Sequence, residues 1–450
     1  MKNTHTPKPL LAQRNYVFWF IGDTSVTIGN FIGAFAFTLL AYPISGSVGI
    51  AGLVGGLYSI AQAITMIPGG MLSDKVNRRT LMYCCSLAGF TVLAALIGVY
   101  ASGLMTTTLL MVFAIIRGLV SGLLGNITNV VLPQIVSKNQ LAQAMGSNQS
   151  RDAIIQILST PVTGFLYGLA PEIPFLISAL LFSLLSLTTK PITADLNPGN
   201  KESDNPVRVD SVAPENRGKD SSSEQSVRTN SVGTRRAGKK HNSLSEIFLW
   251  FLHARAMAMV LLVSAFVNFG ITLILTVIIL DQQQLKTSPT LIGLLDSASG
   301  IGMILGALGL GWASRNLTGA KIMVIAIAWI TLFMVPLAFT TTISVLAILL
   351  FISTLPLISV NSVLGAFSAL LIPNRLRGRI VASEGLIFAG VSSLANVLGG
   401  FMLQYWGYRV TLLVGSGFML ASLLVCLLSS DIRAIPMQNE FDSIQPIEIA

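Results

Sequence analysis

The sequence has few charged residues and few of the side chains that build disulfides or metal centres. Of its 450 residues, 10% are Asp, Glu, Lys or Arg, whereas a soluble globular chain carries roughly 25%. The three cysteines, Cys84, Cys85 and Cys426, lie in apolar runs, and the three histidines do not cluster. We therefore expect neither a disulfide framework nor a metal site, and the composition disfavours a soluble protein.

Signatures of catalysis are missing as well. The chain contains no G-x-x-x-x-G-K-[ST] loop for phosphate binding, so nothing in it supports ATP-driven chemistry. It also contains no recognisable Ser/His/Asp set for nucleophilic catalysis. We expect a protein that is not an enzyme and that needs no cofactor.

Apolar residues are abundant instead. They make up 52% of the chain, and the mean hydropathy is +0.73. A helix that spans a membrane needs about 20 mostly apolar residues. We predict an all-α integral membrane protein with twelve transmembrane helices. They are placed at 16–41, 48–68, 80–101, 107–132, 148–170, 173–189, 257–280, 290–313, 321–340, 343–371, 381–404 and 409–430.

The basic residues orient these spans. With both termini in the cytoplasm, the external loops hold only Lys286 and Arg409, and the other basic residues of the loops and tails lie inside. Basic residues accumulate in the cytoplasmic loops of membrane proteins. We therefore expect a multi-pass protein of the cell membrane with both termini cytoplasmic. The net charge of +9 is then an orientation signal, and no nucleic-acid partner is expected.

A long polar stretch divides the spans six and six. The segment from Thr189 to Ser245 is rich in Ser, Asn, Pro and mixed charges, so it cannot bury enough apolar surface to offset its chain entropy. Two related six-span halves around a midplane site are a known transporter plan. We predict a cytoplasmic tail (1–15), a first half (16–189), a disordered cytoplasmic linker (190–250), a second half (251–430) and a second cytoplasmic tail (431–450).

The loop after the second span carries the most specific motif, GGMLSDKVNRRTLM. It resembles the loop signature of the major facilitator superfamily, G-x-L-a-D-r-x-G-r-r. This resemblance implies that Asp74 contacts the cytoplasmic end of the eleventh span, near Glu384, and helps to hold the outward-facing state. It also implies that Gly70 permits a close helix approach. The predicted conformational latch comprises Gly70, Asp74, Lys75, Arg78, Arg79 and Glu384.

Two charges lie inside the predicted spans. Arg117 is about 15 Å from either end of the fourth span and Asp23 about 10 Å into the first, at 1.5 Å per residue. Charges at such depth are costly, so they should face a cavity or a partner. Arg117 resembles the arginine that drug/proton exporters carry in the fourth span. We predict that Asp23 binds the coupling proton and that Arg117 tunes it; a purely structural role for either remains the alternative.

The fifth span contains STPVTGFLYG, which resembles the antiporter signature G-P-x-x-G-G at Pro161 and Gly164. Pro161 should kink the helix and free a backbone carbonyl. An ordinary kinked helix is the alternative. Polar side chains within spans either line the substrate cavity or bond neighbouring helices. The candidates for the cavity are Asn126, Asn129, Asn268 and Asn361.

The resemblance to proton-coupled drug, macrolide and siderophore exporters implies two pseudo-symmetric six-helix halves that rock around a central cavity. We predict secondary active, proton-driven efflux of a lipophilic small molecule, either a drug or a secreted metabolite. The expected partners are the lipid bilayer, the hydrophobic substrate and protons, and we expect a monomer. Two alternatives stay open: an importer or uniporter of a nutrient, and a membrane receptor or scaffold that transports nothing.

Overall fold

A computed structural model describes residues 9–73, 75–193, 196, 254–373 and 377–437. All regular structure within these residues is helical. Residues 1–8 of the predicted first tail, residues 438–450 of the predicted second tail, most of the predicted linker (190–250) and Asp74 lie outside the described residues.

The first half consists of six long helices. They are α1 (Arg14–Ser45), α2 (Val48–Ser73), α3 (Arg78–Ala101), α4 (Thr107–Ile135), α5 (Lys138–Leu169) and α6 (Ile173–Thr189). A short 3-10 turn, η1 (Leu10–Ala12), precedes α1. The predicted spans of this half therefore correspond one to one with observed helices.

The second half has the same number of spans, although their helices are divided differently. It contains α8 (Arg255–Gln284), α9 (Pro289–Asn316), α10 (Gly319–Met334) with its 3-10 extension η2 (Val335–Phe339), α11 (Ile343–Thr354), α12 (Leu357–Leu371), α13 (Arg377–Leu428) and α14 (Ser430–Arg433). The helices α11 and α12 form one span, and α13 holds two spans that turn at Gly407, whose φ of 76° suits glycine. The twelve predicted spans are confirmed.

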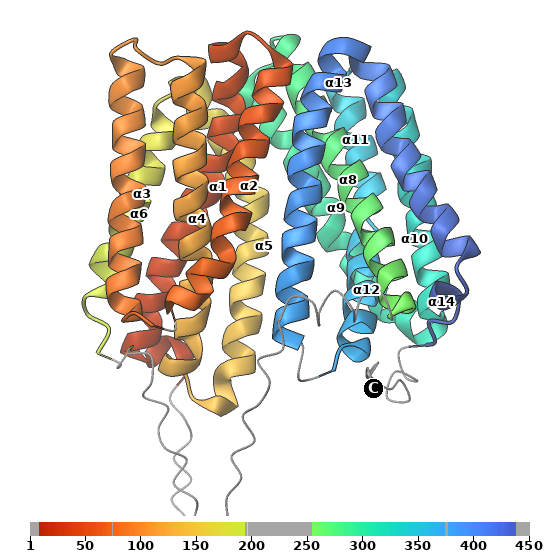
Figure 1. The fold of residues 1–450 in the computed structure, drawn as a ribbon, viewed down its shortest axis with the longest axis horizontal. Coiled ribbons are helices and arrows are strands. Elements are labelled where there is room, and N and C mark those ends of the chain that lie inside the picture. Colours follow the sequence, from red (N-terminus) through yellow and green to blue (C-terminus); the bar gives the residue numbers. More distant parts are fainter. Residues whose placement is uncertain (1–8, 74, 194–195, 197–253, 374–376, 438–450) are drawn as a thin grey trace, which may run out of the picture.

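The two halves stand side by side as bundles, the first in red to yellow and the second in green to blue (Figure 1). Helix α1 begins, α6 ends and α8 begins at one end of the molecule, which we call the linker end. The turns at Gly46, Gly103 and Gly407 lie at the opposite end, which we call the far end.

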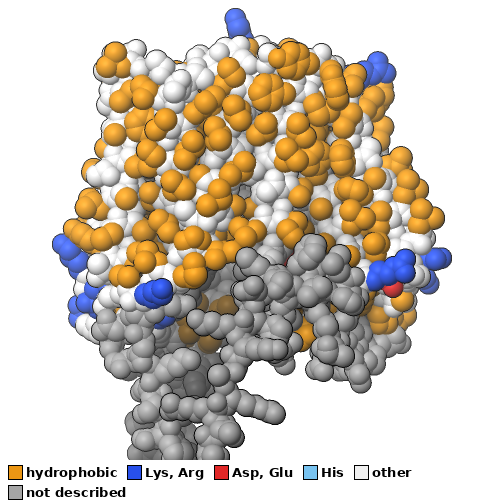
Figure 2. Space-filling model, in the orientation of Figure 1, with side chains coloured by type: hydrophobic (Ala, Val, Ile, Leu, Met, Phe, Trp, Pro, Cys, Tyr) orange, Lys and Arg blue, Asp and Glu red, His pale blue; other side chains and the backbone are white. Residues whose placement is uncertain are grey.

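The surface of the bundles suits a hydrocarbon environment. Apolar side chains cover the middle of the face seen in Figure 2, and lysine and arginine side chains lie near its two ends. Large apolar residues such as Leu308, Trp312 and Leu332 are 77%, 67% and 65% exposed. Exposure of so many apolar side chains would be unfavourable in water, so this surface faces lipid.

Candidate functional site

The two halves contact each other closely at the far end, where α2 crosses α13. A Cβ atom added to Gly52 would lie 2.5 Å from the carbonyl oxygen of Asn396 and 2.9 Å from the Cα of Gly400. The Gln404 Oε1 atom accepts hydrogen bonds from Ser47 Oγ (2.8 Å) and from the backbone N–H of Gly49 (3.1 Å). The backbones of the two helices therefore pack together because glycine leaves the space.

A second crossing, between α5 and α9, closes the same end. A Cβ on Gly293 would lie 2.7 Å from the Cα of Pro161, and one on Gly164 would lie 2.7 Å from the carbonyl carbon of Pro289. Because Pro161 has no N–H, the carbonyl of Ile157 one turn earlier lacks its helical donor. The Ser297 Oγ atom of α9 donates to that carbonyl at 2.6 Å. Pro161 and Gly164 thus lie at a contact between the halves.

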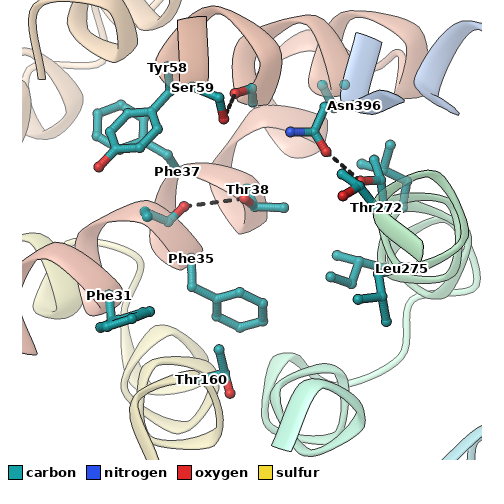
Figure 3. A pocket seen from close by; sticks show the side chains of 17 residues that line it. Phe31, Phe35, Phe37, Thr38, Tyr58, Ser59, Thr160, Thr272, Leu275 and Asn396 are labelled. Carbon is teal, nitrogen blue, oxygen red and sulfur yellow. Dashed lines mark hydrogen bonds between the residues drawn. The ribbon is translucent and has the colours of Figure 1, made fainter. Parts of the chain in front are cut away.

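A cavity of about 340 Å³ lies between these crossings and takes residues from both halves (Figure 3). Phe35 of α1 and Leu275 of α8 face the same space. Thr276 Oγ1 donates to Asn396 Oδ1 at 2.6 Å, so the few polar groups are partly paired with one another. None of the described residues that line it is charged. Its aromatic residues are Phe31, Phe35, Phe37 and Tyr58, and its polar residues are Thr38, Ser59, Thr160, Thr272, Thr276 and Asn396.

The second half contains another cavity, of about 490 Å³, nearer the linker end. It brings together three residues that the sequence singled out: Asn268 of α8, Asn361 of α12 and Glu384 of α13. Asn268 donates to its own helix at the carbonyl of Ser264 (2.9 Å), and Ser368 lies 3.5 Å from the Glu384 carboxylate. The side chains of Asn126 and Asn129, the other two candidates, are not described.

The carboxylate of Asp23 pairs with an arginine of α5. Arg151 Nη2 lies 2.5 Å from Asp23 Oδ2, and Arg151 Nη1 donates to Thr24 Oγ1 at 3.1 Å. The side chains of Asp23 and Arg151 are 8% and 10% exposed, whereas the second acid on this arginine, Asp152 at 2.7 Å, is 48% exposed. The guanidinium also lies 5.0 Å from the Phe20 ring. Asp23 is therefore one member of a buried ion pair between α1 and α5.

The structure does not bring Asp23 and Arg117 together. Arg117 is 1% exposed, its guanidinium stacks 4.3 Å from the Phe182 ring, and its Nη2 donates to Asn30 Oδ1 at 2.7 Å. Its Nε and Nη1 atoms have no hydrogen-bond partner among the described residues. Asn30 and Asp23 are separated by two turns of α1, about 10 Å, so the two charges occupy different levels of the bundle.

The two arginines of the predicted latch contact residues of the first half. Arg78 donates through Nε to the carbonyl of Ser73 (3.2 Å) and through its backbone N–H to that of Leu196 (3.3 Å). Arg79 donates to the carbonyl of Ile192. Ile192 and Leu196 are 1% and 2% exposed. Ile192 and Leu196, near the start of the segment predicted as linker, are thus buried.

Gly70 occupies open space in this conformation. A Cβ at this position would meet no described atom within 4 Å, so no described helix makes a close approach at Gly70 in this conformation. Glu384, the predicted acceptor on α13, faces the cavity of the second half. The contacts between the halves that are described above lie at the far end, away from the residues of the predicted latch.

Two bundles of six spans that close on each other at one end, with a cavity lined by both, define a membrane carrier in which the halves move around a central site. The chain belongs to the Major Facilitator Superfamily, whose family model matches residues 19–281 and 257–446. The protein is therefore a multi-pass membrane transporter rather than an enzyme.

A curated relative and several solved structures resemble the chain. The uncharacterized MFS-type transporter YceJ of Bacillus subtilis (strain 168) is 28% identical over 168 residues, which are 37% of this chain and 41% of the relative's own length. A bacterial homologue of the human lysosomal transporter Spinster, inward-facing and unoccupied, has a TM-score of 0.67 at 14% identity and covers 95% of this chain and 98% of its own. A D-xylose–proton symporter has a TM-score of 0.65 at 12% identity and covers 94% and 99%. At such identities the structures show the shared fold.

Proposed function

We propose that the protein exports lipophilic small molecules across the cell membrane and that inward proton flow drives this export. One observation carries the proposal. A cavity without charged lining lies between the halves, while a buried ion pair, Asp23–Arg151, lies within the first half at another level of α1 and α5. The cavity suits the apolar solute, and the carboxylate suits the proton.

The lining of the central cavity supports a lipophilic substrate. Binding sites for small organic molecules are mostly apolar and aromatic, occupy about 300–1,000 Å³ and carry few polar groups. Four aromatic rings with hydroxyl and amide groups fit that description in about 340 Å³. A sugar would need a hydrogen-bond partner for nearly every hydroxyl that it buries, and this lining offers few. An amphipathic molecule with one or two polar groups matches it better.

The ion pair supports coupling to protons. Protonation of Asp23 removes the charge that holds the Arg151 guanidinium, and Arg151 can then turn fully to Asp152. Because Asp23 lies on α1 and Arg151 on α5, this change acts on two helices that line the central cavity through Phe35 and Thr160. Arg117, stacked on Phe182 one level nearer the cavity, contributes the positive potential that opposes proton binding in the first half.

The distribution of basic residues supports a cytoplasmic linker end. With that sidedness the described conformation is closed toward the exterior, because the α2–α13 and α5–α9 crossings lie at the far end. The latch of Arg78, Arg79 and Glu384 would then engage in the opposite, outward-facing state. The contacts of Arg78 and Arg79 with the first half, and the place of Glu384 in the cavity of the second half, fit that role.

Transport into liposomes tests the proposal. Purified protein should move a hydrophobic dye faster under an imposed pH gradient, and Asp23→Asn should remove the gradient dependence while the protein still folds. Glu172→Gln is the matched control, because this acid lies at the start of α6, outside the Asp23–Arg151–Asp152 cluster, and its loss should leave the coupling in place. Dye movement that ignores the pH gradient in the wild type would remove proton coupling. Movement of a nutrient with the protons would favour an importer, and no flux of any solute would favour a scaffold.

A further inference from the structure

The cavity near the linker end of the second half has no role yet in the proposed function. It measures about 490 Å³ and lies between α8, α12 and α13. Glu384 of α13 is the one charged residue among the described residues that line it. The rest of this lining is apolar or polar without charge, so a single carboxylate faces a largely apolar space.

This cavity and the central cavity follow each other along the same pair of helices. On α8, Asn268 lines the cavity of the second half, and Thr272, one turn later, lines the central cavity. On α13, Phe388 lines the first of these cavities and Asn396, about two turns later, lines the central cavity. Asn396 also accepts the 2.6 Å hydrogen bond from Thr276 of α8, so the two helices are in contact there. The cavities therefore lie in succession from the linker end toward the far end.

Glu384 lies at the linker end of this succession. It precedes Asn396 by 12 residues, or about 18 Å along α13. Its carboxylate lies 3.5 Å from Ser368 Oγ and forms no ion pair with a described residue. A carboxylate with one long hydrogen bond can accept further hydrogen bonds and can pair with a cation.

The groups around this carboxylate suit a positive charge. Phe388 lies one turn after Glu384 on the same face of α13, and the face of an aromatic ring attracts a cation. Asn268 donates through Nδ2 to the carbonyl of Ser264, which leaves its Oδ1 atom as an acceptor. Asn361 of α12 contributes a second amide to the lining. A carboxylate, amide oxygens and a ring all interact favourably with an ammonium or another organic cation.

The same lining disfavours solutes without a positive charge. An anion would meet the charge of Glu384, and no described residue of the lining carries a positive charge to offset it. A neutral solute would displace water from the carboxylate without pairing it, which is unfavourable. Apolar side chains such as Leu364 and Ile372 belong to the same lining, so the cation that fits is joined to an apolar body.

We propose that Glu384 is a specificity residue at the entrance of a path from the linker end along α8 and α13 to the central cavity. It selects solutes in which a cationic group is joined to an apolar body. Such a solute binds first beside Glu384 and then moves toward the aromatic side chains of the central cavity. This inference rests on the proposed export and adds the charge of its substrate.

Equilibrium binding to the purified full-length protein in detergent tests this selection without any gradient. The probes are radiolabelled tetraphenylphosphonium and tetraphenylborate, which have nearly the same shape and opposite charges, and empty micelles give the background. At neutral pH the wild type should bind the cation more tightly than the anion. Glu384→Gln keeps the size of the side chain and removes its charge. It should weaken cation binding by roughly 5- to 50-fold, as for two unit charges about 5 Å apart in a partly aqueous site.

Two further variants separate charge selection from other effects of the substitution. Asp431→Asn removes an acid of α14 that lines neither cavity, and it should leave both affinities unchanged. Asn361→Asp places a carboxylate on another helix of the same cavity, so it should restore cation binding to the Glu384→Gln variant. Asn361→Asp alone should tighten cation binding, which gives a second measurement if Glu384→Gln does not fold.

A wild type that does not prefer the cation would overturn the inference. Equal loss of cation and anion binding in Glu384→Gln would overturn it too, since a latch or a purely structural role predicts that result. Weaker cation binding in Asp431→Asn would show that any acid at this end suffices, and it would also count against Glu384.

These outcomes differ from failure of the proposed export. Gradient-driven dye movement, together with cation binding that does not depend on Glu384, would leave the export standing and retire the specificity residue. Cation binding that depends on Glu384, without gradient-driven movement, would retire the export and keep the site.

Discussion

Replacing Arg151 of the Asp23–Arg151 pair should lower the free energy of unfolding more than replacing Asp23. Arg151→Met takes the guanidinium away from an acid whose side chain is 8% exposed, and breaking a buried ion pair in this way costs about 3–5 kcal/mol. Asp23→Asn leaves Arg151 with Asp152 at 2.7 Å and with the Phe20 ring, so the loss should be nearer about 1–3 kcal/mol. The double variant should lose less free energy of unfolding than the two single variants lose together.

Equilibrium unfolding in mixed detergent micelles, followed by circular dichroism, measures these free energies. Asp152→Asn is the control, because a half-exposed member of an ion pair contributes only about 0–1 kcal/mol. The reasoning predicts the order Arg151→Met, then Asp23→Asn, then Asp152→Asn. Strict additivity of the first two changes would refute the pairing, since residues that do not interact show no coupling free energy.

Three further changes probe other parts of the structure. Gly52→Ala should shift the far end toward its open form, because the new Cβ meets backbone of α13. Gly55→Ala should not, because its Cβ would meet no described atom within 4 Å. The distance between spin labels placed at the far end, one in each half, measures both effects. Arg117→Lys keeps the charge but loses the stacking on Phe182, and unfolding should show a loss of about 2 kcal/mol. Deletion of 201–240 should leave dye export and a monodisperse gel-filtration peak intact; an aggregated product would contradict a linker role for this segment.

Hydropathy predicted the number of spans because lipid imposes a simple rule on each helix, namely enough apolar residues to cross the hydrocarbon. The same rule explains where the prediction was least direct. The first half of α5, from Lys138, is polar, so α5 is not among the nine helical segments of the described chain that qualify as spans by length and hydropathy. The predicted span began only at 148, three residues before Arg151. Helix α5 instead begins 13 residues before Arg151, which places this residue inside the bundle.

The partners of the buried charges were harder to predict than the charges themselves. Asp23 and Arg117 stand out because charges are rare in apolar segments, but the sequence carries no direct record of which helices are neighbours. One signal was present: Asn30 lies seven residues after Asp23, on the same face of α1, and such a face can hold two polar contacts at different levels. Arg117 donates a hydrogen bond to Asn30, and Arg151 pairs with Asp23. The two cations therefore bind at different levels along one face of α1.

The two crossings at the far end differ in chemistry, and this difference decides which contacts must break when the far end opens. The α2–α13 crossing depends mainly on glycine and on close backbone packing, with the uncharged Gln404 as its described side-chain bridge. Its strength should hardly change with pH. The α5–α9 crossing also uses glycine, but Pro161 frees a carbonyl there, and the hydroxyls of Ser297 and Thr160 form side-chain contacts across the crossing. Opening of the far end must therefore break these side-chain contacts at α5–α9, whereas at α2–α13 it mainly separates closely packed backbones.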